Sequence, residues 1–399
     1  MNGDAAQARR AVLGALVCQM GLGLGGYVFA AFLKPIVTEL GWSRTAFSVS
    51  SLPFLLAMSL ASPVVGAATD RLGPRRVFAG GITVVAAALV GLSCMQTLTQ
   101  FYVLGFVLGM GATALGDIPA GTVVARFVRG HAGLALGLVY IGSNIGGALV
   151  PIVATSVTGI SSWRTALQVL AAVGLVLILP AALWLVPGGS GIAGDARADA
   201  PEAADGLTLP QARGTRAFAI LGAVLFLFYC YYLGVNNHLV AYLTDEGFSD
   251  ASAARHFGYV VAVGIAGKLG IGLVTDRLGL RAAVLATFGA LTAGSWLLLY
   301  LAAVPAMRPV FLTVHGLTVA AENVLLPLVV VGCFGARHMP AIYGALMLTL
   351  LPGGVIGPLA AAWSFDVLGS YRPAFGAFAV GTVVALAGLA ALPLARRPR

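Results

Sequence analysis

Three ionisable side chains lie deep inside long apolar stretches of this sequence, and they are the residues best suited to chemistry. They are Asp117, Lys268 and Glu322. If these stretches cross a membrane, a charge at the bilayer centre costs about 2.5–3.5 kcal/mol on insertion scales, so such residues mark functional sites by default. The types are complementary. A buried ammonium attracts anions, and a buried carboxyl can carry a proton.

Lys268 is the strongest candidate for binding an anion. Gly264 and Gly272 lie four residues before and after it, and Gly267 precedes it. Small residues on one helix face leave space beside the amine, either for substrate or for a closely packed helix. An ammonium attracts a carboxylate ~4 Å away by on the order of 4 kcal/mol at an effective dielectric of about 20. The alternative is a lysine paired permanently with a buried acid that joins two helices; we favour substrate binding.

Glu322 is the first candidate for proton coupling. His315 and Thr318 precede it by seven and four residues, so the three side chains form a polar stripe on one helix face. Such a stripe could pass protons to the carboxylate. The alternative for His315 is a local hydrogen bond. In the coupling hypothesis, deprotonated Glu322 pairs with Lys268, and a proton on Glu322 releases the lysine to substrate.

Asp117 is the second candidate for proton coupling, in the segment GDIPAG. Pro119 frees a backbone carbonyl there. The aspartate is expected to bond to this disturbed backbone or to pair with Arg126. Either arrangement predicts a structural or gating role, which we favour over direct contact with substrate.

Uncharged polar residues provide further candidates for the substrate cavity. Tyr140 and Asn144 are four residues apart, and Tyr27 shares a helix face with Gln19 and Gly23. Asn237 and His238 are predicted to form an outer gate. The nearby tyrosines are typical of membrane-interface anchors: Tyr229, Tyr231 and Tyr232.

The composition supports a membrane protein, because 59% of the residues are hydrophobic and only 9% are charged. Soluble domains carry about 25% charged residues. Twelve apolar runs are long enough to cross a bilayer as helices, and their continuity excludes a β-barrel. We therefore predict an all-α membrane protein with twelve transmembrane helices, near residues 11–33, 46–69, 77–97, 101–125, 131–157, 164–186, 216–242, 254–275, 282–303, 309–332, 341–364 and 373–394.

The basic residues predict the orientation. The net charge is +9, but no basic cluster supports nucleic-acid binding. With twelve spans, most arginines fall on the side of the two termini, which predicts that both termini are cytoplasmic. The cations assigned to the opposite side are few: Lys34, Arg44, Arg164, Arg255, Arg308 and Arg372.

The pentapeptide TDRLG occurs twice, at residues 69–73 and 275–279. Other short matches recur at nearly the same offset, so the chain is predicted to be two homologous six-helix halves, 1–186 and 216–399. Residues 187–215 between them, rich in Gly, Ala, Pro and Asp, are predicted to be a flexible cytoplasmic linker. Two homologous halves around a midplane site are typical of alternating-access carriers.

With twelve predicted spans and a repeated loop pentapeptide, the sequence resembles the major facilitator superfamily. The loop motif of that family, G-x-x-x-D-R-x-G-R-R, is matched in the first half with a proline inserted before the arginine pair, and more weakly in the second half. The resemblance implies a gating motif, formed by Gly66, Asp70, Arg71, Gly73, Arg75, Arg76, Asp276 and Arg277.

A narrower similarity is to the bacterial monocarboxylate-transporter and oxalate/formate-antiporter branches. The segments ELGWSRTAFS, GLALGLVYIGSNIGG and DVLGSYRPAF carry it. Those branches typically have an arginine where this chain has Lys268. The monocarboxylate group often has an aspartate where this chain has Gly264, and its animal members have a lysine at a position that we align with Ala31.

The expected function is secondary transport of small organic anions, in first place monocarboxylates, coupled to protons or by exchange. The alternative is a proton-driven exporter of drugs or other amphiphiles. The sequence contains no nucleophile–base or metal-binding motif of the kind that would predict an enzyme. It also has no large soluble domain of the kind that would predict a sensor. No cofactor or metal is expected. The expected partners are a carboxylate substrate, protons and the lipid bilayer, and no nucleic acid is expected. The protein is expected to be a monomer in a bacterial inner membrane.

Overall fold

The computed structural model describes residues 2–49, 51–128, 130–188, 206–245, 247–301 and 304–394. In these residues the chain is helical, apart from one isolated antiparallel bridge between Gly206 and Gly335. Helices satisfy every backbone hydrogen bond internally, as a bilayer requires. Twelve segments are long and apolar enough to span a membrane, so the predicted fold class is confirmed.

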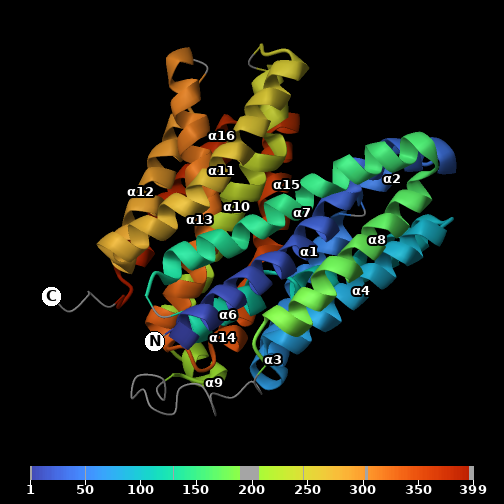
Figure 1. The fold of residues 1–399 in the computed structure, drawn as a ribbon. Coiled ribbons are helices and arrows are strands. Elements are labelled where there is room, and N and C mark those ends of the chain that lie inside the picture. The colour runs from blue at the N-terminus through green and yellow to red at the C-terminus, as the bar shows by residue number, and fades with distance from the viewer. Residues whose placement is uncertain are drawn as a thin grey trace. The chain divides into compact units, whose positions relative to one another are not determined.

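The chain divides into two compact units (Figure 1). The first comprises Met1–Gly206 and Gly335–Ala345, and the second comprises Leu207–Phe334 and Leu346–Arg399. Unit 1 therefore includes most of the short helix α14, which begins the eleventh span. The predicted boundaries of the halves, which place residues 335–345 with the second half, remain a prediction.

Unit 1 holds the first six spans in order, with a short helix after the first. Its helices are α1 (Asn2–Leu40), α2 (Arg44–Val49), α3 (Ser51–Leu72), α4 (Pro74–Cys94), α5 (Leu98–Ala114), α6 (Asp117–Phe127), α7 (Ala132–Ile160), α8 (Trp163–Pro180), the π-helix η1 (Ala181–Leu185) and, from the distant segment, α14 (Met339–Leu346). The fourth span is broken between α5 and α6, and the sixth ends in η1.

Unit 2 holds the remaining spans. Its helices are α9 (Leu209–Arg213), α10 (Arg216–Asp245), α11 (Asp250–Leu278), α12 (Leu280–Leu298), η3 (Pro305–Met307), α13 (Arg308–Phe334), η4 (Met347–Thr349), α15 (Leu350–Leu368) and α16 (Arg372–Ala390). Most of the predicted linker, residues 189–205, lies outside the described residues. Its last part forms α9, which begins with a capping box between Thr208 and Gln211.

The repeated pentapeptide has the same local structure in both units. Each copy ends a helix at a glycine with positive φ, 80° at Gly73 and 89° at Gly279, and the next helix starts immediately after it. With ψ near 160°, this conformation is essentially restricted to glycine. The glycine of TDRLG is therefore required by the sharp turn between two antiparallel spans.

A second repeated feature is a pair of glycines that allows two helices to pack closely. In unit 1, α7 lies along α1 (Figure 1), and side chains at Gly142 and Gly146 would overlap the carbonyl groups of Leu16 and Met20. In unit 2, α15 packs on α10 in the same way, through Gly353 and Gly357. Glycines four residues apart are the usual means of close helix contact in membranes.

We expect Gly146→Ala to destabilise the protein. The new methyl group would meet the backbone of Met20, and such overpacking typically costs about 1–3 kcal/mol. Gly26 of α1 provides a matched control, because nothing lies within 4 Å of a Cβ added there. Alanine at that position should be neutral or stabilising, by up to about 1 kcal/mol. Thermal unfolding in detergent measures both variants, and equal melting temperatures would contradict this account of the α1–α7 contact.

Candidate functional site

Lys268 lies in the second half of α11 and is only 8% exposed. The helix face beside it packs closely on α13, because a Cβ at Gly267 would overlap the backbone of Leu317. A Cβ at Gly264 would lie 3.2 Å from the Cβ of Ala320. Of the two explanations for these glycines, close helix packing therefore accounts for Gly264 and Gly267. Lys268 itself is a buried lysine on a closely packed pair of helices.

Glu322 lies on the neighbouring helix α13 and is 6% exposed. The hydroxyl of Tyr229, on α10, donates a hydrogen bond of 3.3 Å to its Oε1, and lies 3.3 Å from the sulfur of Met347. Glu322 also lines a cavity whose other walls are apolar side chains of α10, α12, α13 and α16, among them Leu225, Phe288 and Leu389. Burying a carboxylate in such surroundings is costly unless it is hydrogen-bonded or protonated.

His315 lies on α13 seven residues, or about two helical turns, before Glu322, and it is completely buried. Its Nδ1 lies 2.8 Å from the hydroxyl of Tyr231, its ring stacks on Phe311, and its Nε2 has no hydrogen-bond partner among the described residues. Thr318 donates to carbonyl groups of its own helix. The role of the predicted stripe in proton transfer remains a prediction. Two tyrosines of α10 reach across to its acid and its histidine.

In unit 1, Asp117 is the first residue of α6, directly after the break in the fourth span. Pro119 contributes to this break because it has no N–H to continue the helix from α5. The side-chain nitrogen of Gln19, on α1, donates a hydrogen bond of 2.5 Å to Asp117, and the hydroxyl of Tyr140, on α7, donates one of 3.1 Å to the Asp117 carbonyl oxygen. Asp117 thus links three spans at a broken helix, through its carboxyl to α1 and through its backbone carbonyl to α7.

This arrangement brings together residues that the sequence associated only loosely. Gln19 is fully buried, and its Oε1 has no hydrogen-bond partner among the described residues. Asn144, one turn after Tyr140, is half-buried. Tyr27 is 46% exposed, and its ring lies against Gly147 of α7. The Gln19 contact was not predictable, because no local pattern indicates which spans face each other.

The predicted outer-gate residues differ in their surroundings. Asn237 is exposed, whereas His238 is half-buried, with its Nε2 3.1 Å from the carbonyl oxygen of Pro358 and its ring 5.3 Å from that of Tyr371. Burial, followed by the negative charges of Asp245 and Asp366, raises the pKa of Tyr371. The tyrosine therefore stays neutral at physiological pH, and it stacks on Phe365.

The first copy of the loop motif lies against α14 within unit 1. The Ala341 backbone N–H, in the first turn of α14, donates to the Asp70 carboxylate, and Arg126 forms an ion pair of 3.7 Å with Asp70. First-turn N–H groups have no partner within their helix and favour an anion. A side chain at Gly66 would overlap the carbonyl of Pro340, which explains the glycine. Asp70 therefore faces a helix N-terminus.

The arginines of the motif have different environments. Arg71 and Arg76 are exposed, and Arg75 lies half-buried beside Gly188. In the second copy, Asp276 is half-buried in the last turn of α11 and Arg277 is exposed. The gating role of these residues remains a prediction.

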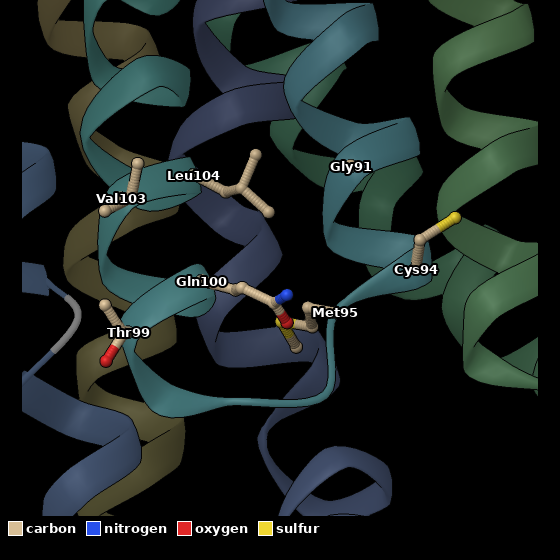
Figure 2. Close-up of a pocket in the computed structure, with 7 residues that line it drawn as sticks. All are labelled: Gly91, Cys94, Met95, Thr99, Gln100, Val103 and Leu104. Carbon is tan, nitrogen blue, oxygen red and sulfur yellow. The ribbon is translucent and has the colours of Figure 1, made fainter.

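A separate hollow lies at the junction of α4 and α5, and Figure 2 shows it between the end of one span and the start of the next. It is lined by Gly91, Cys94, Met95, Thr99, Gln100, Val103 and Leu104. Gln100 belongs to the capping box that begins α5 at Thr97. In the described part of the chain, no group of three or more His, Cys, Asp or Glu residues could hold a metal ion.

Twelve membrane spans, a duplicated loop motif and buried charges are features of transporters, and comparison with known proteins decides the family. A sequence model of the Major Facilitator Superfamily matches residues 15–314. The chain belongs to this superfamily. It is a membrane transporter rather than an enzyme.

Curated relatives of this chain include a monocarboxylate transporter, an efflux protein and an antiporter. Monocarboxylate transporter 13 of Rattus norvegicus is 27% identical over 326 residues, which cover 79% of this chain and 73% of that protein. The fujikurins efflux protein of Gibberella fujikuroi is 27% identical over 248 residues, 61% of this chain and 49% of that protein. MFS antiporter QDR3 of Candida albicans is 26% identical over 157 residues, 39% of this chain and only 22% of that protein.

Solved structures of superfamily members share the fold. The human organic anion transporter MFSD10 (TETRAN) is similar with a TM-score of 0.72 and 17% identity, covering 96% of this chain and 99% of that one. The E. coli fucose:proton symporter FucP also gives a TM-score of 0.72, with 13% identity and coverage of 95% and 98%. At these identities the similarity concerns the fold alone.

Proposed function

We propose that this superfamily member is a secondary active transporter of small organic anions, in first place monocarboxylates. The observation that carries the proposal is the buried ammonium of Lys268, 8% exposed in a membrane span. Intramembrane charges face protein or a polar pathway rather than lipid, and a cation there selects negatively charged solutes. The similarity to monocarboxylate transporter 13 over 79% of the chain supports the same substrate class.

We propose proton coupling or exchange through Glu322, with Asp117 as the second carboxyl. Glu322 is buried on the helix beside the one that carries Lys268, so charge balance can link proton and anion. A proton on Glu322 would free Lys268 for a substrate carboxylate, and proton and anion would then cross together. Asp117 joins three spans at a helix break, which favours a structural or gating contribution.

The decisive experiment compares substrate classes in proteoliposomes that contain the purified chain. We expect a panel of small monocarboxylates to give saturable uptake and to raise the melting temperature, while neutral sugars do neither. Stabilisation by amphiphilic neutral or cationic compounds, with carboxylates inert, would overturn the proposal.

That contrary result would favour the second candidate, an exporter of amphiphiles. The similarity to the fujikurins efflux protein is the specific observation that supports it. In such an exporter the buried carboxyls would carry protons and the aromatic side chains would contact the cargo.

The orientation, with both termini in the cytoplasm, is tested by thiol labelling. Cys94, at the end of α4, is exposed, Cys18 and Cys230 are buried, and Cys333 is half-buried. We expect a membrane-impermeant maleimide to label intact cells through Cys94 alone, and Cys94→Ser to abolish the signal. Labelling that appears only after the cells are permeabilised would reverse the orientation.

A further inference from the structure

A basic crevice lies in unit 1 where the first, third and sixth spans end together. It has a volume of about 600 Å³, within the usual range for small-molecule sites. Its lining includes two cations, Arg10 of α1 and Arg75 of α4, and the indole of Trp184 in η1. Among the described residues, none of those that line it carries a carboxylate.

The two arginines are held at this crevice in different ways. Arg10 donates to the backbone carbonyl of Trp184, one of the last carbonyls of the sixth span, so its position is fixed. Arg75 lies against Gly188, where an added Cβ would be 3.0 Å from its Nη1. Among the described residues Arg75 has no hydrogen bond or ion pair, so its donors are available to a ligand.

The other residues that line the crevice indicate that its ligand comes from the bilayer rather than from solution. Trp184 is 67% exposed although it ends a membrane span, and such rings are typical of the headgroup level of a bilayer. Leu183, Val186 and Pro187 give the same crevice an apolar wall. A ligand that fits therefore has an anionic group for the arginines and an apolar part that continues into the bilayer.

We propose that this crevice binds the phosphate headgroup of an anionic phospholipid from the cytoplasmic leaflet. The leaflet follows from the arginine distribution, which assigns this end of the spans to the cytoplasm. Basic pockets between transmembrane helices on that side favour anionic headgroups, and guanidinium groups bind phosphate oxygens in bidentate fashion. The proposal is independent of the transported substrate.

The test is native mass spectrometry of the full chain with added phosphatidylglycerol or phosphatidylcholine. We expect the wild type to retain phosphatidylglycerol preferentially, and added salt to weaken the retention. Arg10→Gln combined with Arg75→Gln should lower phosphatidylglycerol affinity about twenty-five-fold, since each arginine near an anionic surface contributes about fivefold. The control pair Arg9→Gln and Arg213→Gln removes two exposed cations outside the crevice and should leave retention unchanged.

Three results would overturn the proposal. The first is equal retention of the two lipids by the wild type, and the second is equal loss in the control pair. The third is competition by inorganic phosphate or glycerol phosphate as effective as that by the lipid, which would make the crevice a site for soluble anions. The salt dependence of the wild type decides the matter even if the double variant fails to fold.

Discussion

Lys268→Gln is expected to abolish saturable uptake of small monocarboxylates, with a fall of at least about a hundredfold. Glutamine keeps a polar side chain, one atom shorter, but removes the positive charge that would neutralise a carboxylate there. An ion pair at ~4 Å and an effective dielectric of about 20 amounts to on the order of 4 kcal/mol, so a hundredfold loss is a conservative expectation. Initial uptake rates in proteoliposomes measure it.

The sequence provides a close control for this variant. Its only other lysine is Lys34, which is exposed near the end of α1. Lys34→Gln should transport normally, and Lys268→Arg should retain part of the activity because it keeps a cation. Full uptake by Lys268→Gln, in protein with an unchanged melting temperature, would end the organic-anion proposal.

Glu322→Gln is expected to separate exchange from proton-driven accumulation. The amide mimics a permanently protonated carboxyl and still accepts the hydrogen bond from Tyr229. Anion exchange between loaded proteoliposomes should therefore continue, because Lys268 stays available to substrate throughout the cycle. Accumulation driven by a pH gradient should fall by about tenfold or more, as general acid–base groups commonly contribute 10²–10⁴.

The control for Glu322→Gln is Glu39→Gln. Glu39 pairs with Arg164 at the end of α1 and is largely exposed, so its loss should cost at most about 1 kcal/mol of stability. Uphill accumulation should survive this change. If Glu322→Gln accumulated substrate as well as the wild type, proton coupling would have to be assigned to another carboxyl, with Asp117 the next to test.

The twelve spans were predictable because each is a continuous apolar run, and the doubling was predictable because TDRLG has to form the same glycine turn twice. The break in the fourth span had a visible cause in Gly116 and Pro119. By contrast, the π-helix at Ala181–Leu185 has no sequence signal that distinguishes it from an ordinary helix end.

Partners across the bundle were the least predictable part of the candidate site. Arg126 forms an ion pair with Asp70, a partner that the sequence did not indicate. Tyr229 and Tyr231 were interpreted as interface anchors, but they contact Glu322 and His315. Spacing within one helix decides which residues share a face. Which other helix that face meets depends on tertiary packing, for which a single sequence carries no direct signal.

The glycine pairs on α7 and α15 bear on how inactive variants should be interpreted. Side chains at Gly142, Gly146, Gly353 or Gly357 would collide with backbone rather than with cargo. A genetic screen for transport loss would therefore recover these positions as readily as Lys268, although their effect would come from helix packing. Melting temperatures separate the two classes, because damaged helix contacts lower thermal stability whereas the loss of one side-chain charge need not.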